Sequence, residues 1–131
     1  MLYGSETWTL RVEDVKRIHA FEMWAYRRML RIAWMERRIN FSIQAVLNVK
    51  TRLAVVCKQR ILRFFGHVIR RDGSSLEKLT IEGKIEGKRS RGRTPMRWIA
   101  QIKTITGYPP EEAIRSAENR ELRKEIVADV N

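Results

Sequence analysis

Apolar residues recur at spacings of three and four along residues 13–33, which predicts an amphipathic α-helix. The stripe consists of Val15, Ile18, Phe21, Ala25, Met29 and Ile32. Glu13 and Asp14 stand in the first turn and three arginines stand near the end, an order that suits the helix dipole. Trp24 and Tyr26 lie off the stripe, so we expect this helix to pack on more than one side.

A second amphipathic stretch starts at Thr51, its expected N-cap, and ends at a turn over residues 72–75. Its apolar face consists of Leu53, Val56, Cys57, Ile61, Phe64 and Val68, widened by Leu62, Phe65 and Ile69. The neighbouring stripe consists of Arg60, Arg63, His67, Arg70 and Arg71. Gly66 inside the helix costs roughly 1 kcal/mol relative to Ala. We therefore expect either a close helix crossing at Gly66 or a break before His67.

Shorter elements are expected between and after these helices. Asn40 or Ser42 is the expected cap of a helix over residues 43–47. Residues 76–93 carry a weak apolar pattern that suits a short strand or a helical turn equally. Their three glycines favour a loop that connects neighbouring elements.

Two further helices are expected after residue 93. The first has Thr94 as cap and Pro95 at its first position, and Gly107 ends it. Its inward residues are Trp98, Ile99, Ile102 and Ile105. The second starts at residues 109–110 and has a thin apolar stripe, so we expect it to be peripheral. The whole pattern predicts a mainly α fold of about five helices with a connecting segment rich in glycine, arginine and lysine.

The charge of the chain is high and uneven. The 131 residues carry a net charge of +12 and give a pI of about 10.7. Residues 52–93 contain 12 lysines and arginines against 4 acidic residues, whereas residues 110–131 contain 4 against 6. The net charge predicts a nucleic acid or an anionic surface as partner, and the surplus of +8 places the contact in the first segment.

Known catalytic and metal-binding patterns are missing from the sequence. Cys57 is the one cysteine, so no internal disulfide can form and an intracellular compartment is the natural inference. His19 and His67 do not give a zinc-ligand spacing. The sequence has no ATPase-type phosphate loop, no recognised catalytic triad and no apolar run of about 18 residues. We expect no catalytic residue, metal site or cofactor in this chain, and no enzymatic activity from it alone.

Arginine is well suited to phosphate, because its planar fork donates two hydrogen bonds at once and keeps its charge. The basic stripe of the second helix is followed directly by further cations as far as residue 97. A solvated basic helix face is the plain alternative for the stripe alone. The predicted phosphate contacts are Arg60, Arg63, Arg70, Arg71, Lys88, Arg89, Arg91, Arg93 and Arg97.

Four ordered blocks carry a resemblance to a known family. They are L-Y-G-S-E-T-W-T-L (residues 2–10), A-F-E-M-W-A-Y-R-R-M-L-R-I-A-W (20–34), R-F-F-G-H-V-I-R-R-D (63–72) and E-G-K-R-S-R-G-R-T-P-M-R-W-I (86–99). The chain resembles the segment that follows the polymerase core in non-LTR retrotransposon reverse transcriptases of the endonuclease–reverse transcriptase type. The family usually has proline directly after R-G-R, where this chain has Thr94.

The resemblance implies that residues 1–75 are a thumb-like helical segment, and that residues 76–131 are a basic linker with C-terminal helices. The parent enzyme would be a nuclear, magnesium-dependent RNA-directed DNA polymerase, whose catalytic residues lie upstream of this chain. This segment would grip the RNA/DNA template–primer behind the active site. The upstream polymerase core would be its second partner, against which Tyr3, Trp8, Trp24 and Tyr26 would pack.

Two other classes of function stay open. The first is a stand-alone binding module, because Arg91-Gly92-Arg93 before Pro95 resembles a minor-groove hook for A·T-rich DNA with Thr94 inserted. The second is a purely structural protein, which leaves the basic surplus unexplained. Structural roles are expected for Trp8, Trp24, Trp34, Phe64 and Trp98, of which Trp98 is expected to lie nearest the nucleic acid.

Overall fold

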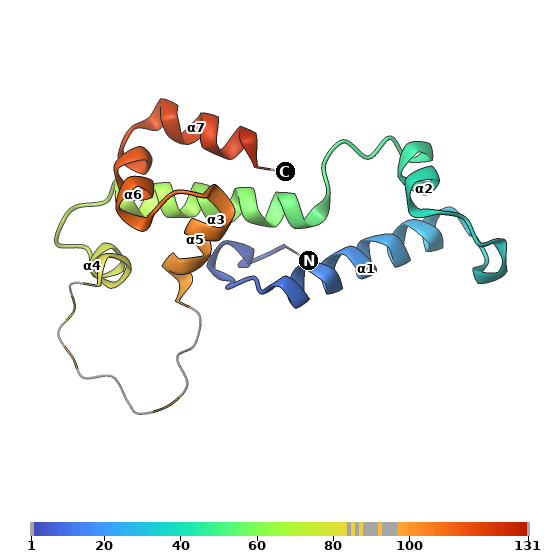
Figure 1. Ribbon diagram of the computed structural model, residues 1–131, viewed down its shortest axis with the longest axis horizontal. Coiled ribbons are helices and arrows are strands. Elements are labelled where there is room, and N and C mark those ends of the chain that lie inside the picture. Colours follow the sequence, from blue (N-terminus) through green and yellow to red (C-terminus); the bar gives the residue numbers. More distant parts are fainter. Residues whose placement is uncertain (1, 84, 86, 88–91, 93–96, 131) are drawn as a thin grey trace. The chain divides into compact units, whose positions relative to one another are not determined.

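Figure 1 shows the computed structural model of the chain, which describes residues 2–83, 85, 87, 92 and 97–130. Within these residues the chain forms helices and no strand. The elements in order are η1 (Ser5–Thr7), α1 (Val12–Met29), η2 (Trp34–Glu36), α2 (Asn40–Val46), α3 (Leu53–Ile69), α4 (Leu76–Glu82), α5 (Trp98–Thr106), α6 (Pro110–Glu118) and α7 (Arg120–Asp129). The mainly α class is confirmed, whereas the described residues hold seven α-helices rather than about five.

The chain divides into two compact units. The α1–α2 unit comprises residues 10–56, and the α3–α7 unit comprises residues 1–9 and 57–131. Helix α3 begins in the α1–α2 unit and continues into the α3–α7 unit. These unit boundaries follow from the packing of the chain. The division between a thumb-like segment and a basic linker at residues 75 and 76 rested on the family resemblance, and it stays a prediction.

Helix α1 begins where its first-turn acids predicted and ends earlier than expected. The backbone N–H of Arg11 donates to Asp14 Oδ2 at 3.0 Å, which closes the first turn. At the other end, Arg31 adopts a left-handed backbone with a φ of 53°. The helix therefore stops at Met29, although the apolar spacing continues to Ile32. The expected end at residue 33 is wrong because a backbone reversal interrupts a periodic pattern.

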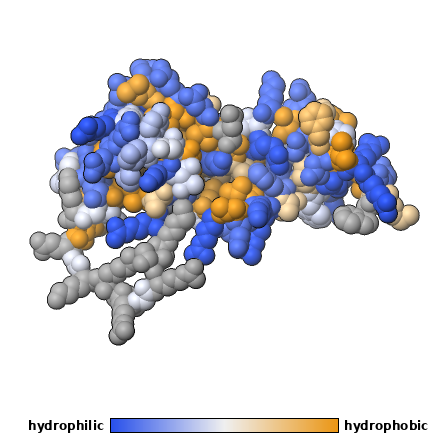
Figure 2. Space-filling view, viewed as in Figure 1, coloured by the Kyte–Doolittle hydropathy of each residue, from blue (hydrophilic) through white to orange (hydrophobic). Residues whose placement is uncertain are grey.

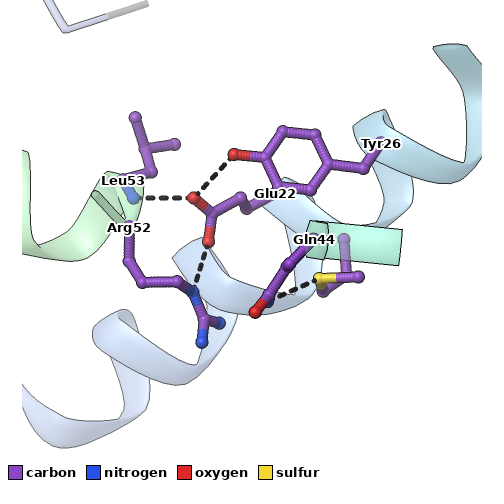
Figure 3. A network of polar contacts seen from close by, with 6 residues as sticks. Glu22, Tyr26, Gln44, Arg52 and Leu53 are labelled. Carbon is purple, nitrogen blue, oxygen red and sulfur yellow. Dashed lines mark hydrogen bonds and ion pairs between the residues drawn. The ribbon is translucent and has the colours of Figure 1, made fainter. Parts of the chain in front are cut away.

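Glu22 of α1 is the polar centre of the α1–α2 unit (Figure 3). Its carboxylate accepts hydrogen bonds from the Leu53 backbone N–H at 2.7 Å, from Arg52 Nε at 3.0 Å and from the Tyr26 hydroxyl at 3.0 Å. The Glu22 side chain is only 2% exposed. Thr51, the expected N-cap of α3, is exposed and lies two residues before the helix. That capping prediction is wrong, because a carboxylate from α1 receives the first N–H of α3.

Helix α2 confirms the expected short helix but not its cap. Ile39 is the N-cap and makes no side-chain capping bond. Ser42 Oγ donates to the Ile39 carbonyl at 2.8 Å, and Asn40 Oδ1 accepts from Arg27 Nη2 at 2.8 Å. The prediction of Asn40 or Ser42 as cap is therefore wrong, because both side chains are engaged elsewhere. Ile43 is the fully buried residue of this helix.

The α3–α7 unit is built on the apolar face of α3. Its buried apolar side chains come from four helices and from the residue after α7, and are Cys57, Ile61, Leu62, Phe65, Val68, Ile69, Ile102, Ala113, Ala117, Val127 and Val130. Helix α3 runs through Gly66 without a break, and α7 lies alongside it (Figure 1). A Cβ on Gly66 would lie 2.2 Å from Cδ of Arg123 on α7. Of the two expectations for Gly66, the close helix crossing is the correct one.

The segment after α3 contains a further helix, α4, which settles its first part as helical rather than extended. Helix α5 begins at Trp98 with Arg97 as N-cap. Gly107 ends α5 with a φ of 78°, as expected. The expected helix start at Thr94 and Pro95 lies outside the described residues.

The last expected helix is in fact two helices that meet at Asn119. The Asn119 backbone is extended, and its Oδ1 accepts the N–H of Glu121 at 3.0 Å, so it caps α7. Ala113 and Ala117 of α6 and Val127 of α7 are buried. The expectation of one peripheral helix is wrong. The small alanine side chains let α6 pack closely against the core, so its burial is greater than its few apolar residues suggested.

Apolar residues reach the surface among hydrophilic ones (Figure 2). In the α1–α2 unit the exposed large apolar residues are Val12, Phe21, Trp24, Met29, Met35, Ile39, Phe41 and Val46. Tyr26 is partly buried and donates a hydrogen bond to Glu22, whereas Trp24 is 59% exposed. The ring centroids of Trp24 and Phe21 are 5.8 Å apart. None of the helices described is long and apolar enough to span a membrane.

Candidate nucleic-acid interface

Helix α3 presents a basic face that its own packing holds in place. Cys57, Ile61 and Val68 are at most 1% exposed, so they fix the rotation of the helix about its axis. The neighbouring side exposes Arg60 and Arg63, which are separated by about one turn. The 17 residues of α3 include no aspartate or glutamate. A helix with one face buried, and with exposed arginines and no acidic residue on the rest of its surface, offers anions a preformed surface.

Arg60 and Arg63 line a shallow groove of about 250 Å³ together with Glu6 and Phe64. Arg60 Nη1 donates to the Leu2 carbonyl at 2.9 Å, which holds the N-terminal segment against α3. The Arg63 side chain makes no hydrogen bond or ion pair with any residue described. One guanidinium is therefore partly engaged, and its neighbour is free to bind an external anion.

Arg70 and Arg71 were predicted phosphate contacts, and both have partners within the protein. Arg70 Nη1 donates to the Ala117 carbonyl at 2.9 Å, near the C-terminal end of α6, where a positive charge suits the helix dipole. Arg71 Nη1 forms an ion pair with Glu77 Oε1 at 2.5 Å. A hydrogen bond from Ser75, and also the charge of Arg71, lower the pKa of Glu77. The exposed pair of Arg71 with Glu77 is weak and can be exchanged for phosphate.

The remaining predicted contacts lie along the connecting segment. Arg97 is exposed at the start of α5. Next to it, the Trp98 ring packs against Phe64 and Phe65, with centroid distances of 6.1 and 6.0 Å. The other predicted contacts lie outside the described residues and are Lys88, Arg89, Arg91 and Arg93.

The five aromatic residues expected to be structural have different environments. Phe64 is partly buried by its edge-to-face contact with Trp98. Trp8 is 38% exposed, and its carbonyl accepts a hydrogen bond from Gln101 Nε2 at 2.7 Å. The Trp34 side chain lies outside the described part of the chain. Phe64 and Trp98 are therefore the two whose packing supports the α3 face.

Sequence reasoning missed three basic residues of α7, which are Arg120, Arg123 and Lys124. They lie in the C-terminal segment with its acidic balance, so the average charge concealed them. Arg123 and Lys124 line a second groove of about 320 Å³, which they share with Arg63 of α3. The close helix crossing expected at Gly66 was the one sequence feature that could have pointed to a second helix beside α3, but it did not identify that helix as α7.

The described side chains of this site are mainly cationic, polar and apolar. The residues described contain no group of three or more histidine, cysteine, aspartate or glutamate side chains that could hold a metal ion. Burial raises the pKa of the Cys57 thiol, which the nearby Arg60 opposes, so this cysteine is a packing residue and not a nucleophile. What the described arrangement can do is neutralise an anion through guanidinium groups.

A third groove, of about 670 Å³, lies within the α1–α2 unit. Its walls combine basic and apolar residues and consist of Arg27, Ile32, Ala33, Met35, Arg37 and Arg38. Arg27 Nη2 already donates to the Arg38 carbonyl at 3.2 Å, and Arg38 pairs with Glu36 at 3.3 Å. Internal bonds thus engage two of its three arginines, and it is a weaker anion site than the α3 face.

Comparison with known proteins connects the chain to a mobile element. A transposon-derived protein from Caenorhabditis elegans is 32% identical to it over 108 residues. The match covers 79% of this chain and 38% of that protein, so the chain spans well under half the length of its relative. No family model and no solved structure matches the chain. The similarity supports an origin of this sequence in a transposable element.

Proposed function

We propose that this chain is the thumb and following segment of a non-LTR retrotransposon reverse transcriptase, an RNA-directed DNA polymerase. It grips the template–primer through the sugar–phosphate backbone, and the catalytic palm lies elsewhere in the parent protein. The observation that carries the proposal is the acid-free face of α3, with Arg60 and Arg63 exposed on a helix whose other face is buried. The similarity to a transposon-derived protein and the family resemblance of the four sequence blocks add to it.

The α3 face suits a regular backbone better than a particular base sequence. Its arginines sit on a helix and not on a loop, so their spacing is fixed before the ligand arrives. Arginine contacts to phosphate set position and register but carry no base information. Binding by this face is therefore independent of sequence and strongly dependent on salt.

The polymerase core is the second partner in this proposal. Phe21 and Trp24 are exposed side by side on α1, and Val12 is 72% exposed at its start. Aromatic side chains bury 150–250 Å² each when covered. A polymerase core packed over this part of α1 would remove that apolar area from water and place the thumb against the palm.

The test is the salt dependence of binding to a duplex and to an RNA–DNA hybrid. If about five phosphates are neutralised, log affinity against log salt slopes at about −4 to −5. Replacement of Arg89, Arg91 and Arg93 by Ala flattens the slope by two to three units, and Arg60→Gln with Arg63→Gln flattens it by about two. Lys16, Arg17 and Arg28 are exposed on α1, so their triple alanine variant is the control of equal charge.

Two results would contradict this function. Affinity that does not change with salt, or no binding at low salt, would remove the nucleic-acid partner. Equal flattening by the α1 control would show a nonspecific effect of net charge and not a contact surface. Preference for A·T-rich duplex over the hybrid would instead favour the stand-alone minor-groove module.

A further inference from the structure

Arg123 of α7 lies in a notch of α3 that only glycine provides. A Cβ on Gly66 would lie 2.2 Å from Cδ and 3.3 Å from Cγ of Arg123, closer than packed atoms allow. Because Gly66 has no side chain, the aliphatic part of Arg123 crosses α3 at this point. The Nε atom of Arg123 is buried without a hydrogen-bond partner in the described part of the chain. The notch therefore fixes the position of Arg123, while no acceptor among the described residues binds its guanidinium.

Other cations gather around this position. Arg70 Nη1 would lie 3.1 Å from the same Cβ. Burial, and then the charges of Arg123 and Arg120, lower the pKa of Arg70, because its protonated form is repelled by like charges nearby. Arg70 has the Ala117 carbonyl as acceptor. The side chains of Arg120 and Arg123 form no ion pair or hydrogen bond with any described residue, so positive charge accumulates here without a matching carboxylate from the described part of the chain.

The cations open onto a groove between α3 and α7. The groove of about 320 Å³ is lined by Gln59, Arg63, Arg123, Lys124, Val127 and Ala128. Lys124 pairs with Glu121 at 2.9 Å, and both side chains are more than half exposed, so an external anion can replace that carboxylate. Arg63 also lines the neighbouring groove with Arg60. The two grooves therefore meet at Arg63.

We propose that the groove between α3 and α7 binds a backbone phosphate of the nucleic acid, held between Arg63 and Arg123 with Lys124 at its edge. Gly66 is the positioning residue, because it lets Arg123 reach the groove. The inference rests on the proposed function for its ligand class and extends the contact surface to a helix that the sequence charge did not indicate. Amide and apolar groups complete the walls of the groove, which suits a phosphodiester because the attached sugar can contact them.

Site-directed crosslinking tests the location directly. Cys57 is fully buried, so a photoreactive thiol label can be placed on introduced cysteines in the full chain. Ala128→Cys puts the label in the groove between α3 and α7, and Glu6→Cys puts it in the groove with Arg60. Glu112→Cys, exposed in the first turn of α6, is the matched control, and labelled wild type measures any reaction at Cys57.

The three positions separate the inference from the proposed function. We expect labels at positions 6 and 128 to crosslink a radiolabelled RNA–DNA hybrid at low salt several-fold more than the label at 112. Crosslinking at 6 with position 128 no higher than 112 would overturn the inference and leave the proposed function intact. Crosslinking at none of the three, with no binding by wild type, would overturn both.

A second measurement does not depend on the label. Arg123→Gln with Lys124→Gln should flatten the salt slope of hybrid binding by one to two units. Glu111→Gln with Glu112→Gln is the control on α6, where the charge change has the opposite sign and the slope should not flatten. Circular dichroism confirms the fold of each variant. A folded Arg123/Lys124 variant with the wild-type slope would contradict the phosphate site.

Discussion

Replacement of Glu22 by Gln tests whether one buried carboxylate fixes the start of α3. Glu22 accepts three hydrogen bonds, and the strongest in geometry is the 2.7 Å bond from the Leu53 N–H. A glutamine has the same shape but one acceptor oxygen, and its amide group would face the donor Nε of Arg52. The substitution therefore keeps part of the network and places a donor against a donor at the position of the ion pair.

The size of the effect follows from the burial of the two partners. Loss of one partner from a fully buried ion pair costs about 3–5 kcal/mol. Here the Glu22 side chain is 2% exposed while that of Arg52 is 37% exposed, so the freed arginine can turn to water. A hydrogen bond to a charged group contributes about 1.5–3 kcal/mol. We expect Glu22→Gln to lower the free energy of unfolding by about 2–3 kcal/mol.

The assay is urea unfolding followed by circular dichroism at pH 7 and at a series of lower pH values. Burial raises the pKa of Glu22, but hydrogen bonds from Leu53, Arg52 and Tyr26 outweigh it, so the folded pKa lies below the ordinary value. A depressed carboxylate pKa stabilises the fold above the unfolded pKa of about 4.3. That contribution is lost as the pH falls through the folded pKa, so the gap between wild type and Glu22→Gln should shrink there.

Two outcomes would refute this reasoning. A Glu22→Gln protein within about 0.5 kcal/mol of wild type at pH 7 would show that the carboxylate charge contributes little. A gap that stays constant down to low pH would show that its ionisation is not linked to folding. Arg52→Gln is the companion variant, and the double variant measures the coupling of the pair directly.

Two further predictions concern backbone geometry. Gly66→Ala should gain about 1 kcal/mol of helix propensity and lose about 1–3 kcal/mol by overpacking against Arg123. Thermal melts should therefore show net destabilisation, which the additional substitution Arg123→Ala should reverse. A higher stability of the single variant would contradict the close contact at Gly66. Arg31→Gly should raise the free energy of unfolding by about 1 kcal/mol, because a φ of 53° strains a residue with a side chain. Arg28→Gly, inside α1, is the control and should lower the free energy of unfolding by a similar amount. Equal losses of stability in the two variants would contradict the argument.

The two long helices could be read from the sequence because their apolar spacing is regular, whereas their ends could not. The cap of α3 comes from Glu22, which is 31 residues away from Leu53, so no local pattern contains it. The end of α1 depends on the left-handed backbone of Arg31, where glycine would have given a signal. Asn119 was readable, since asparagine is a favoured N-cap, and the thin apolar stripe around it hid the division of the last helix.

The basic residues of the candidate interface also show that local sequence spacing does not reveal tertiary contacts. Periodicity placed Arg60 and Arg63 on an exposed face, and the structure agrees. The same periodicity grouped Arg70 with them, although it is half-buried and bonded to α6. Its distance from Ala117 along the sequence, 47 residues, explains why helix spacing alone could not show this contact. Local spacing gives the direction of a side chain, and tertiary packing decides whether that direction is open to solvent.

Net charge over a sequence window is an equally incomplete guide to a binding surface. Residues 110–131 carry more acids than bases, yet the two kinds of charge are placed on different elements. Glu111 and Glu112 stand in the first turn of α6, where the helix dipole favours them, whereas Arg123 of α7 lies against Gly66 of α3. A ligand within a Debye length of about 8 Å at physiological salt responds to the nearest groups and not to the average of the segment. The field at α3 is therefore more positive than the C-terminal composition indicates, and the helix crossing at Gly66 brings that charge to the face where Arg63 is already exposed.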